Sequence, residues 1–284
     1  MEIINRKARM ASLTRKLRRE NKTIGLVPTM GALHAGHLSL VQEARQMCDI
    51  VIVSIFVNPT QFGKNEDFDK YPRDLTTDAA MLAEYQADYV FAPTAAEIYP
   101  SGFSTYVWVE GFSETLEGEI RPGHFRGVAT VVAILLNTIR PDFAFFGQKD
   151  AQQSIIIKRL TKDLGFETEI VIMPIIREES GLAMSSRNAF LSLEERQAAA
   201  VIFRSLKDAK IAVREGERNA SILAQIVSER INSEPLANLD YVAVVDGETL
   251  EPVEKVDDRE ILIAVAARFG KTRLIDNTIL NRKQ

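Results

Sequence analysis

Several residue types are scarce in this chain of 284 residues, and each scarcity excludes a class of protein. A single cysteine, Cys48, cannot form a disulfide within one chain, so a disulfide-built scaffold is excluded. Cys48 is interpreted as a buried structural thiol on the apolar side of a helix. No apolar run is long enough to cross a bilayer, and the charged residues from Glu2 through Arg9 are not typical of a signal peptide. We therefore expect a cytoplasmic protein with no membrane partner.

An excess of charge of one sign is also lacking. The formal net charge is −4 and the isoelectric point is near 5.6. The only compact basic cluster, Arg15 to Arg19, is interpreted as the solvated face of a helix. A nucleic-acid partner is therefore not expected, because such binding depends on basic surface that neutralises phosphates. The hydrophobic content of 46% is sufficient for a substantial core in one large or two modest domains.

Histidine is equally scarce, and its placement is the most informative feature of the chain. Only His34, His37 and His124 occur, and each lies in a segment that contains glycine. The residues from Thr23 to Val27 favour a strand, and apolar residues at helical spacing follow from His37 onward. A tight turn between them would direct free backbone N–H groups and the positive end of a helix dipole toward a ligand. The expected ligand is a phosphate group.

The pattern of the first 174 residues alternates strands with helices. Continuous apolar runs such as 50–57 are typical of parallel strands that are covered on both faces. We therefore predict a Rossmann-like, doubly wound parallel α/β sheet for residues 1–176. The predicted strands are Thr23–Val27, Ile50–Val57, Tyr89–Ala92, Phe143–Phe146 and Glu167–Met173, and the predicted helices are Leu38–Met47, Thr76–Tyr85, Val128–Ile139 and Ala151–Leu164.

After Ile176 the composition changes, and residues 177–284 are predicted to form a second, smaller α+β domain. Its predicted helices are Leu193–Glu215 and Ala220–Asn232, and its predicted strands are Tyr241–Val245, Glu260–Ala266 and Thr272–Ile275. Three polar loops follow strands of the first domain: Pro28–His37, Asn58–Gly63 and Gly147–Asp150. Ligands of doubly wound sheets bind at the carboxyl ends of the strands, so we expect these loops to meet at one edge.

Each candidate group has an alternative interpretation that the sequence leaves open. The pair His34 and His37 suits phosphoryl oxygens, but it is also compatible with packed surface histidines or with a zinc site. Lys149 and Asp150 suit a triphosphate and a ribose, or they are ordinary residues of a helix start. The tetrapeptide Met184–Arg187 offers two hydroxyls and a guanidinium as a phosphate clamp, although alone it is a weak signal.

Together these motifs carry a resemblance to a known family. His34–His37 (HAGH) is similar to the HIGH signature, and Met184–Arg187 (MSSR) is similar to the KMSKS-type loop, of the HIGH-motif nucleotidyltransferase superfamily. More narrowly, five co-linear motifs resemble those of the pantothenate synthetase family. They are Pro28–His37, Phe56–Gly63, Arg121–Val128, Phe146–Asp150 and Ser185–Asn188. The resemblance is weaker over the last hundred residues, where only the architecture is similar.

The resemblance implies an ATP-dependent ligase, with Mg²⁺, that joins (R)-pantoate to β-alanine. The products implied are (R)-pantothenate, AMP and pyrophosphate, and the intermediate implied is an enzyme-bound pantoyl adenylate. The family also implies a homodimer whose substrates are small molecules. A transferase that stops after nucleotide transfer, a non-catalytic nucleotide sensor and a class I aminoacyl-tRNA synthetase remain alternatives. The first would need no amine, the second would show no pantoate-dependent exchange of pyrophosphate, and the third would need a basic tRNA surface.

Site residues follow from the resemblance, position by position. His37, His34 and Lys149 would be catalytic. The residues expected to contact ATP are Met30, Gly31, Ala32, Leu33, His34, Ala35, Gly36, His37, Gly147, Gln148, Lys149, Asp150, Ile176, Met184, Ser185, Ser186 and Arg187. The residues expected to hold pantoate are Gln61, Gln153, Asn58 and His124, and Gln61 would also contact β-alanine.

The two glutamines also make chemical sense without the family. A neutral amide can hold an acid through its hydroxyls without a salt bridge, which would weaken the carboxylate as a nucleophile. Asp74 and Asp78, on the helix expected after Arg73, are candidates for magnesium bound through ATP phosphates, with Asp78 preferred, although most acidic residues at a helix start act as caps.

Overall fold

The computed structural model describes residues 1–63 and 68–280, which divide into two compact units. The first unit comprises Met1–Gly147 and Ile156–Met173, and the second comprises Gln148–Ile155 and the chain from Pro174 onward. The sequence interpretation placed a single boundary after Ile176. The structure instead changes unit after Met173, and it assigns the short segment Gln148–Ile155, which follows the fifth strand of the first unit, to the second unit.

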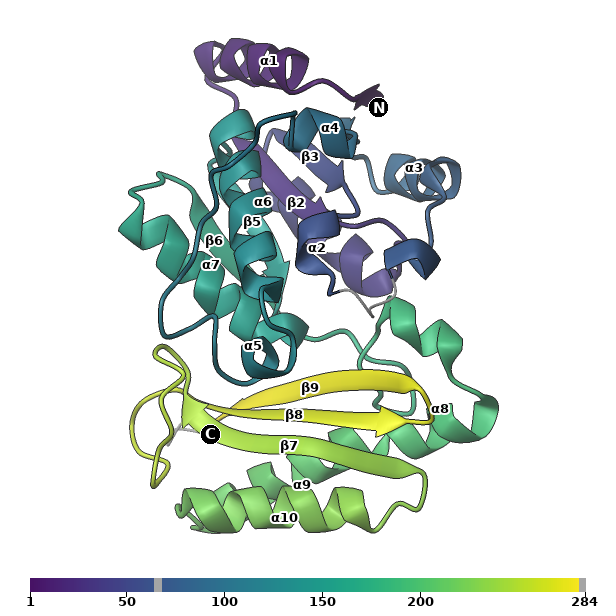
Figure 1. The fold of residues 1–284 in the computed structure, drawn as a ribbon, viewed down its shortest axis with the longest axis vertical. Coiled ribbons are helices and arrows are strands. Elements are labelled where there is room, and N and C mark those ends of the chain that lie inside the picture. Colours follow the sequence, from purple (N-terminus) through teal and green to yellow (C-terminus); the bar gives the residue numbers. More distant parts are fainter. Residues whose placement is uncertain (64–67, 281–284) are drawn as a thin grey trace. The chain divides into compact units, whose positions relative to one another are not determined.

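The first unit is built on a six-stranded sheet in the order β1-β4-β3-β2-β5-β6 (Figure 1). All its pairs are parallel, including the long register from Ile24 opposite Ile50 to Thr29 opposite Ile55. The strands are β1 (Glu2–Ile4), β2 (Ile24–Thr29), β3 (Ile50–Ile55), β4 (Tyr89–Phe91), β5 (Phe143–Gly147) and β6 (Glu169–Met173). The order reverses between β2 and β5, which is where doubly wound sheets bind ligands. The predicted α/β fold is confirmed.

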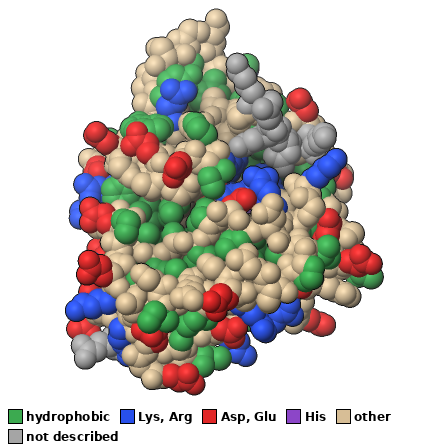
Figure 2. All heavy atoms as spheres, turned by 60° about the horizontal axis from the view of Figure 1, so that its bottom comes forward, with side chains coloured by type: hydrophobic (Ala, Val, Ile, Leu, Met, Phe, Trp, Pro, Cys, Tyr) green, Lys and Arg blue, Asp and Glu red, His purple; other side chains and the backbone are tan. Residues whose placement is uncertain are grey.

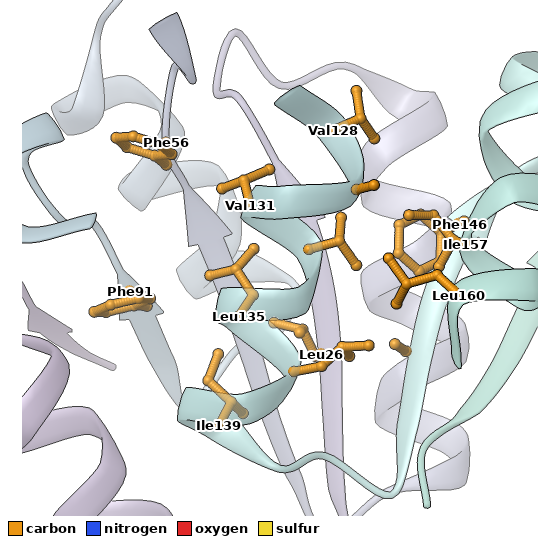
Figure 3. Close-up of a cluster of buried hydrophobic side chains, with 14 of the residues drawn as sticks. Leu26, Phe56, Phe91, Val128, Val131, Leu135, Ile139, Phe146, Ile157 and Leu160 are labelled. Atoms are coloured by element: carbon orange, nitrogen blue, oxygen red, sulfur yellow. The ribbon is translucent and has the colours of Figure 1, made fainter. Parts of the chain in front are cut away.

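Alternation along the strands creates two apolar layers, one on each face of this sheet. Leu26, Ile52, Phe91 and Phe146 belong to a cluster with α6 and the second half of α7 (Figure 3). The residues that alternate with these along the same strands, such as Val27 and Val53, belong to a second cluster with α2 and α3. Because both faces are covered, the central strands β2 and β3 are largely apolar, as the sequence indicated.

Helices and short 3-10 turns connect or cover these strands. The longer helices are α1 (Lys7–Arg19), α2 (Ala35–Met47), α3 (Leu75–Glu84), α6 (His124–Ile139) and α7 (Ala151–Asp163). The short elements include α4 (Ala95–Ile98), α5 (Glu117–Ile120) and the 3-10 turn η1 (Pro59–Gln61). Cys48 is buried behind α2, and burial raises the pKa of its thiol to about 11. The thiol therefore stays protonated near neutral pH, which agrees with a structural role.

The second unit contains an antiparallel sheet in the order β7-β8-β9. Its strands are β7 (Ala237–Asp246), β8 (Ile261–Phe269) and β9 (Thr272–Leu280), and its helices are α8 (Leu193–Ala199), α9 (Val201–Arg214) and α10 (Ala220–Asn232). One buried cluster joins the helices to the side chains on one face of β8, such as Ile263 and Val265. The predicted α+β character of this part is therefore confirmed.

Most of the predicted elements of the second unit differ from the structure in their bounds: β7 begins at Ala237 and ends at Asp246, β8 ends at Phe269, and two further differences are larger in kind. The helix predicted over 193–215 is two helices, which meet at Ala200. The strand predicted to end at Ile275 continues to Leu280. That prediction ended early because Asp276 and Asn277 belong to residue types that are depleted in strands, whereas here both are buried within the sheet.

The distribution of surface charge and the character of the helices bear on the expected partners. On the face shown in Figure 2, acidic and basic side chains are interspersed and form no single-sign field. Among residues 1–63 and 68–280, no helix has the length and apolar character needed to cross a membrane.

Candidate active site

The turn between β2 and α2 is held by a buried carboxylate from α3. Gly31 and Ala32 adopt positive φ angles of 83° and 51°. The Oδ2 atom of Asp78 accepts a hydrogen bond from Ala32 N at 3.0 Å, and its Oδ1 atom accepts one from Leu33 N at 2.9 Å. A Cβ atom at Gly31 would lie 2.8 Å from Asp78 Oδ2, so the close approach also requires glycine. Asp78 is only 3% exposed, and it fixes the shape of the turn.

This geometry corrects one expectation about the turn. The sequence predicted free backbone N–H groups for a phosphate, but three of the amides are already engaged within the protein. Gly31 N donates to Thr29 Oγ1 at 3.2 Å, in addition to the two amides bound by Asp78. The expected contact of Ala32 and Leu33 with ATP therefore does not run through their N–H groups in this geometry. The start of α2 and the imidazoles of His34 and His37 are the other groups of this segment that the sequence analysis expected to bind a phosphate.

His34 and His37 lie together at the start of α2. Their ring centroids are 4.1 Å apart with an interplanar angle of 35°. His34 is the N-cap residue, and its Nδ1 atom accepts a hydrogen bond from Gly36 N at 3.1 Å. Because Nδ1 is the acceptor, the neutral ring carries its hydrogen on Nε2. His34 is thus held as a donor through Nε2.

The loop after β3 orients Gln61 through a chain of hydrogen bonds. Asn58, only 1% exposed, donates from Nδ2 to Gln61 Oε1 at 3.1 Å and to Gly127 O at 3.0 Å. Gln61 Nε2 lies 3.0 Å from the thioether of Met30. A thioether is a weak acceptor, so an oxygen of a ligand is a better partner for this N–H. The structure therefore brings the predicted residues Met30, Asn58 and Gln61 together.

His124, the first residue of α6, ties the same loop from the other side. Its Nδ1 atom lies 2.8 Å from Gln61 O, and its Nε2 atom lies 3.1 Å from Arg121 Nη1. A carbonyl only accepts and a guanidinium only donates, so the ring is the neutral Nδ1–H tautomer. Both ring nitrogens thus have partners within the protein. This arrangement favours a role in holding Gln61, since direct contact with pantoate would require one of these bonds to be exchanged.

Two residues of this network were missed by the sequence analysis. The hydroxyl of Tyr99 donates to Asn58 Oδ1 at 2.8 Å, and Thr60 Oγ1 donates to the same oxygen at 2.9 Å. Burial raises the pKa of the Tyr99 phenol, so it remains a donor. These bonds hold the amide of Asn58 with its Nδ2 atom facing Gln61. Tyr99 lies 38 positions after Gln61 in no recognisable motif, so the sequence contained no signal for it.

The remaining predicted residues belong to the second unit, except Gly147, which ends β5. Gln148, Lys149 and Asp150 form the 3-10 turn η3 (Gln148–Asp150), where Lys149 Nζ lies 3.6 Å from Asp150 Oδ1. Gln153 follows on the first part of α7. The structure brings Ile176 and Met184 together, because Met184 N donates to Ile176 O at 2.9 Å. Ser185 caps the 3-10 turn η4 (Ser186–Phe190) by accepting from Arg187 N.

The described residues contain no group of three or more side chains suited to hold a metal. Asp78 was expected to carry magnesium, but both of its oxygens already accept from the turn. The geometry therefore favours an anchoring role for Asp78. A magnesium ion bound mainly by phosphates would fit this donor set, since Mg²⁺ usually keeps its waters and uses few protein ligands.

Comparison with known proteins identifies the family. The family model described as pantoate-beta-alanine ligase matches residues 2–279. The chain belongs to the pantoate-β-alanine ligase family. A pantothenate synthetase from Pelotomaculum thermopropionicum is 50% identical over 282 residues, which are 99% of this chain and 100% of the relative. A pantothenate synthetase from Heliobacterium modesticaldum is 52% identical over 280 residues, which are 99% of each chain.

Solved structures of pantoate-β-alanine ligases agree with this assignment. The pantothenate synthetase of Thermus thermophilus has a TM-score of 0.92 at 43% identity, covering 98% of this chain and 99% of that one. The ligase of Francisella tularensis, complexed with beta-gamma ATP and beta-alanine, has a TM-score of 0.80 at 35% identity, covering 100% of this chain and 98% of that one. The predicted ligase class and the predicted fold are confirmed.

The anchoring role of Asp78 predicts the effect of its amide variant. Asp78→Asn leaves one backbone N–H of the turn opposite an amide NH₂, so we expect the free energy of unfolding to fall by about 1–3 kcal/mol. Urea unfolding measures this change. The control is Asp74→Asn on the same helix, where Asn replaces an equally good N-cap and stability should be nearly unchanged. A metal role predicts something different, namely that adding Mg²⁺ in the presence of ATP stabilises the wild type and not the Asp78 variant.

Proposed function

We propose that this chain condenses (R)-pantoate with β-alanine at the expense of ATP, giving (R)-pantothenate, AMP and pyrophosphate. Membership of the pantoate-β-alanine ligase family over residues 2–279 supports the reaction. The relative from Francisella tularensis, described as a complex with beta-gamma ATP and beta-alanine, supports two of the three substrates. The observation that carries the proposal in the structure is the histidine pair at the start of α2, with His34 held as a donor.

The first step is attack on ATP by the pantoate carboxylate. One carboxylate oxygen forms a bond to the α-phosphorus, the bond to the bridging oxygen of the β-phosphate breaks, and pyrophosphate leaves. Negative charge grows on the phosphoryl oxygens in this step, so donors placed beside them lower the barrier. We assign that role to His37 and His34, which the helix dipole of α2 assists. Lys149 contributes a mobile positive charge to the phosphates.

The second step releases AMP. The neutral amine of β-alanine attacks the acyl carbon of pantoyl adenylate, an amide bond forms, the acyl–oxygen bond breaks, and the amine loses a proton. Gln61 serves both steps in this scheme, since a neutral amide can hold pantoate and lie near the incoming amine without forming a salt bridge. Asn58 and His124 hold Gln61, and Gln153 supplies the second amide. Residues Gly147 to Asp150, Ile176 and Met184 to Arg187 contact ATP. Magnesium, held mainly by the phosphates, neutralises part of their charge.

We further propose that the protein works in the cytoplasm as a homodimer without a nucleic-acid or membrane partner. The mixed surface charge in Figure 2 is compatible with small-molecule substrates. Sedimentation velocity checks the oligomeric state, with a mass of twice the 31.8 kDa chain expected.

An assay of AMP release tests the proposed reaction directly. We expect AMP and pyrophosphate only when pantoate, β-alanine and ATP are all present in multiple turnover. With β-alanine omitted, pantoate should still support exchange of labelled pyrophosphate into ATP, because the adenylate forms reversibly. Exchange that needs no pantoate, or AMP release that ignores β-alanine, would contradict the ligase scheme. A nucleotidyltransferase that stops at its first product would instead release pyrophosphate without β-alanine and release no AMP, because its nucleotide stays attached to the acceptor.

The orientation of Gln61 predicts which substrate its loss affects. Gln61→Ala removes the N–H that only a thioether engages in the ligand-free protein, so we expect pantoate affinity to fall roughly tenfold. ATP affinity should change little. Titration calorimetry with each substrate measures both constants. Equal losses for pantoate and ATP would instead indicate that the variant distorts the turn through Met30.

A further inference from the structure

Strand β9 carries three adjacent polar residues that are buried, Asp276, Asn277 and Thr278, and the first two hold other segments of the second unit. Asp276 is 4% exposed and Asn277 is 2% exposed, whereas their strand neighbours Leu274 and Leu280 are apolar. Consecutive residues of a strand point to opposite faces of the sheet. Buried polar side chains are retained where specific partners satisfy them. The partner of Asp276 is Arg177, whose backbone bridges to Ala183 just before the Met184–Arg187 loop, and the partners of Asn277 are Gln148 and Lys149 in a turn expected to contact ATP.

Asp276 holds the base of the Met184–Arg187 loop. Its Oδ2 atom accepts from Arg177 Nη1 at 2.6 Å, and its Oδ1 atom accepts from Arg177 Nη2 at 3.0 Å. Arg177 Nη1 also donates to Gly181 O at 3.0 Å, and its guanidinium lies 4.4 Å from the centre of the Phe203 ring. The backbone of Arg177 forms a bridge with Ala183, immediately before the loop. This bidentate, largely buried ion pair therefore fixes where the loop begins.

Asn277 holds the turn that carries Lys149. Its Nδ2 atom donates to Gln148 O at 2.8 Å and to Lys149 O at 3.0 Å. Its Oδ1 atom accepts from Gln148 Nε2 at 3.2 Å. Both hydrogens of the amide are thus used on the backbone of η3. The backbone of Asn277 is also tied to Asp276, because Asn277 N donates to Asp276 Oδ1 at 2.8 Å.

We propose that Asp276 and Asn277 are positioning residues for ATP, which hold the Lys149 turn and the Met184–Arg187 loop in one fixed geometry. Neither residue needs to touch the nucleotide. Asp276 acts through the guanidinium of Arg177, and Asn277 acts on the backbone of Gln148 and Lys149. The two residues are adjacent in one strand, so a displacement of either segment is resisted by the same sheet. The inference rests on the proposed function, because that function gives both segments their contact with ATP.

Paired variants with matched controls test the inference. We expect Asp276→Asn and Asn277→Ala each to slow pantoate-dependent adenylation by on the order of tenfold to a hundredfold. KM for ATP should rise, and KM for β-alanine should stay within about twofold, the scatter expected of sites without shared partners. The control for Asp276 is Asp240→Asn, which breaks a carboxylate–arginine pair on the same sheet. The control for Asn277 is Asn238→Ala at an exposed position of β7. Both controls should retain wild-type kinetics.

Double-mutant cycles separate positioning from general stability. Asn277→Ala should have little further effect in a Lys149→Met background, and Asp276→Asn should have little further effect in an Arg187→Ala background. Losses that multiply in both cycles would overturn the proposal, because they would show that the strand acts only through overall stability. If Asn277→Ala does not fold, Asn277→Ser, which keeps one donor, takes its place in the cycle.

Hydrogen exchange of the ligand-free protein keeps this inference distinct from the proposed reaction. We expect Asn277→Ala to speed amide exchange in peptides covering 148–151, and Asp276→Asn to speed it in peptides covering 183–188. Unchanged exchange in both peptides would overturn the inference even if the wild type is an active ligase. A wild type without pantoate-dependent pyrophosphate exchange would overturn the proposed function, while the exchange pattern would still test the strand.

Discussion

The contact between the carboxylate of Asp78 and the turn after β2 is the constraint on which the histidine pair depends. Two oxygens on a helix of one layer engage two successive amides of the turn, at 3.0 and 2.9 Å. They hold Gly31 and Ala32 in a left-handed conformation that an unsupported alanine rarely adopts. This turn fixes where α2 begins and therefore where His34 lies. The buried carboxylate of Asp78 thus acts by fixing the backbone of the turn. Both of its oxygens accept hydrogen bonds from the turn, which offset its negative charge near an expected phosphate.

Uncharged side chains dominate the other half of the site in the first unit. Tyr99, Thr60 and Gly127 orient the amide of Asn58, which orients that of Gln61. Each member uses a donor or acceptor whose direction the previous member sets, and the N–H of Gln61 lies against the weak acceptor of Met30. Such a network costs little to reorganise when a stronger oxygen acceptor arrives, because only one weak bond is exchanged. In the proposed reaction, such uncharged side chains would leave the carboxylate of pantoate without a salt bridge.

The sequence predicted the sheet, most helices and the loops of the site, because these depend on local patterns. Apolar runs such as 50–57 specified buried parallel strands, and the scarce histidines marked the turn. The partners that act across the fold were not predictable in the same way. The carboxylate of Asp78 was interpreted as a metal candidate because nothing in its neighbours reveals that it reaches residues 32 and 33. Tyr99 lies in no motif. Asp276 and Asn277 even shortened a predicted strand, since their local preference opposes the structure that tertiary partners impose on them.

We propose that imidazoles at the start of α2 stabilise the charge that develops when ATP is attacked at its α-phosphorus. The most direct test is the rate at which His37→Ala forms pantoyl adenylate in a single turnover. Rapid quench at saturating ATP and pantoate measures this rate. The account predicts a rate lower by on the order of a hundredfold or more, with cooperative unfolding unchanged. Adenylate formation at the wild-type rate in the folded variant would contradict it.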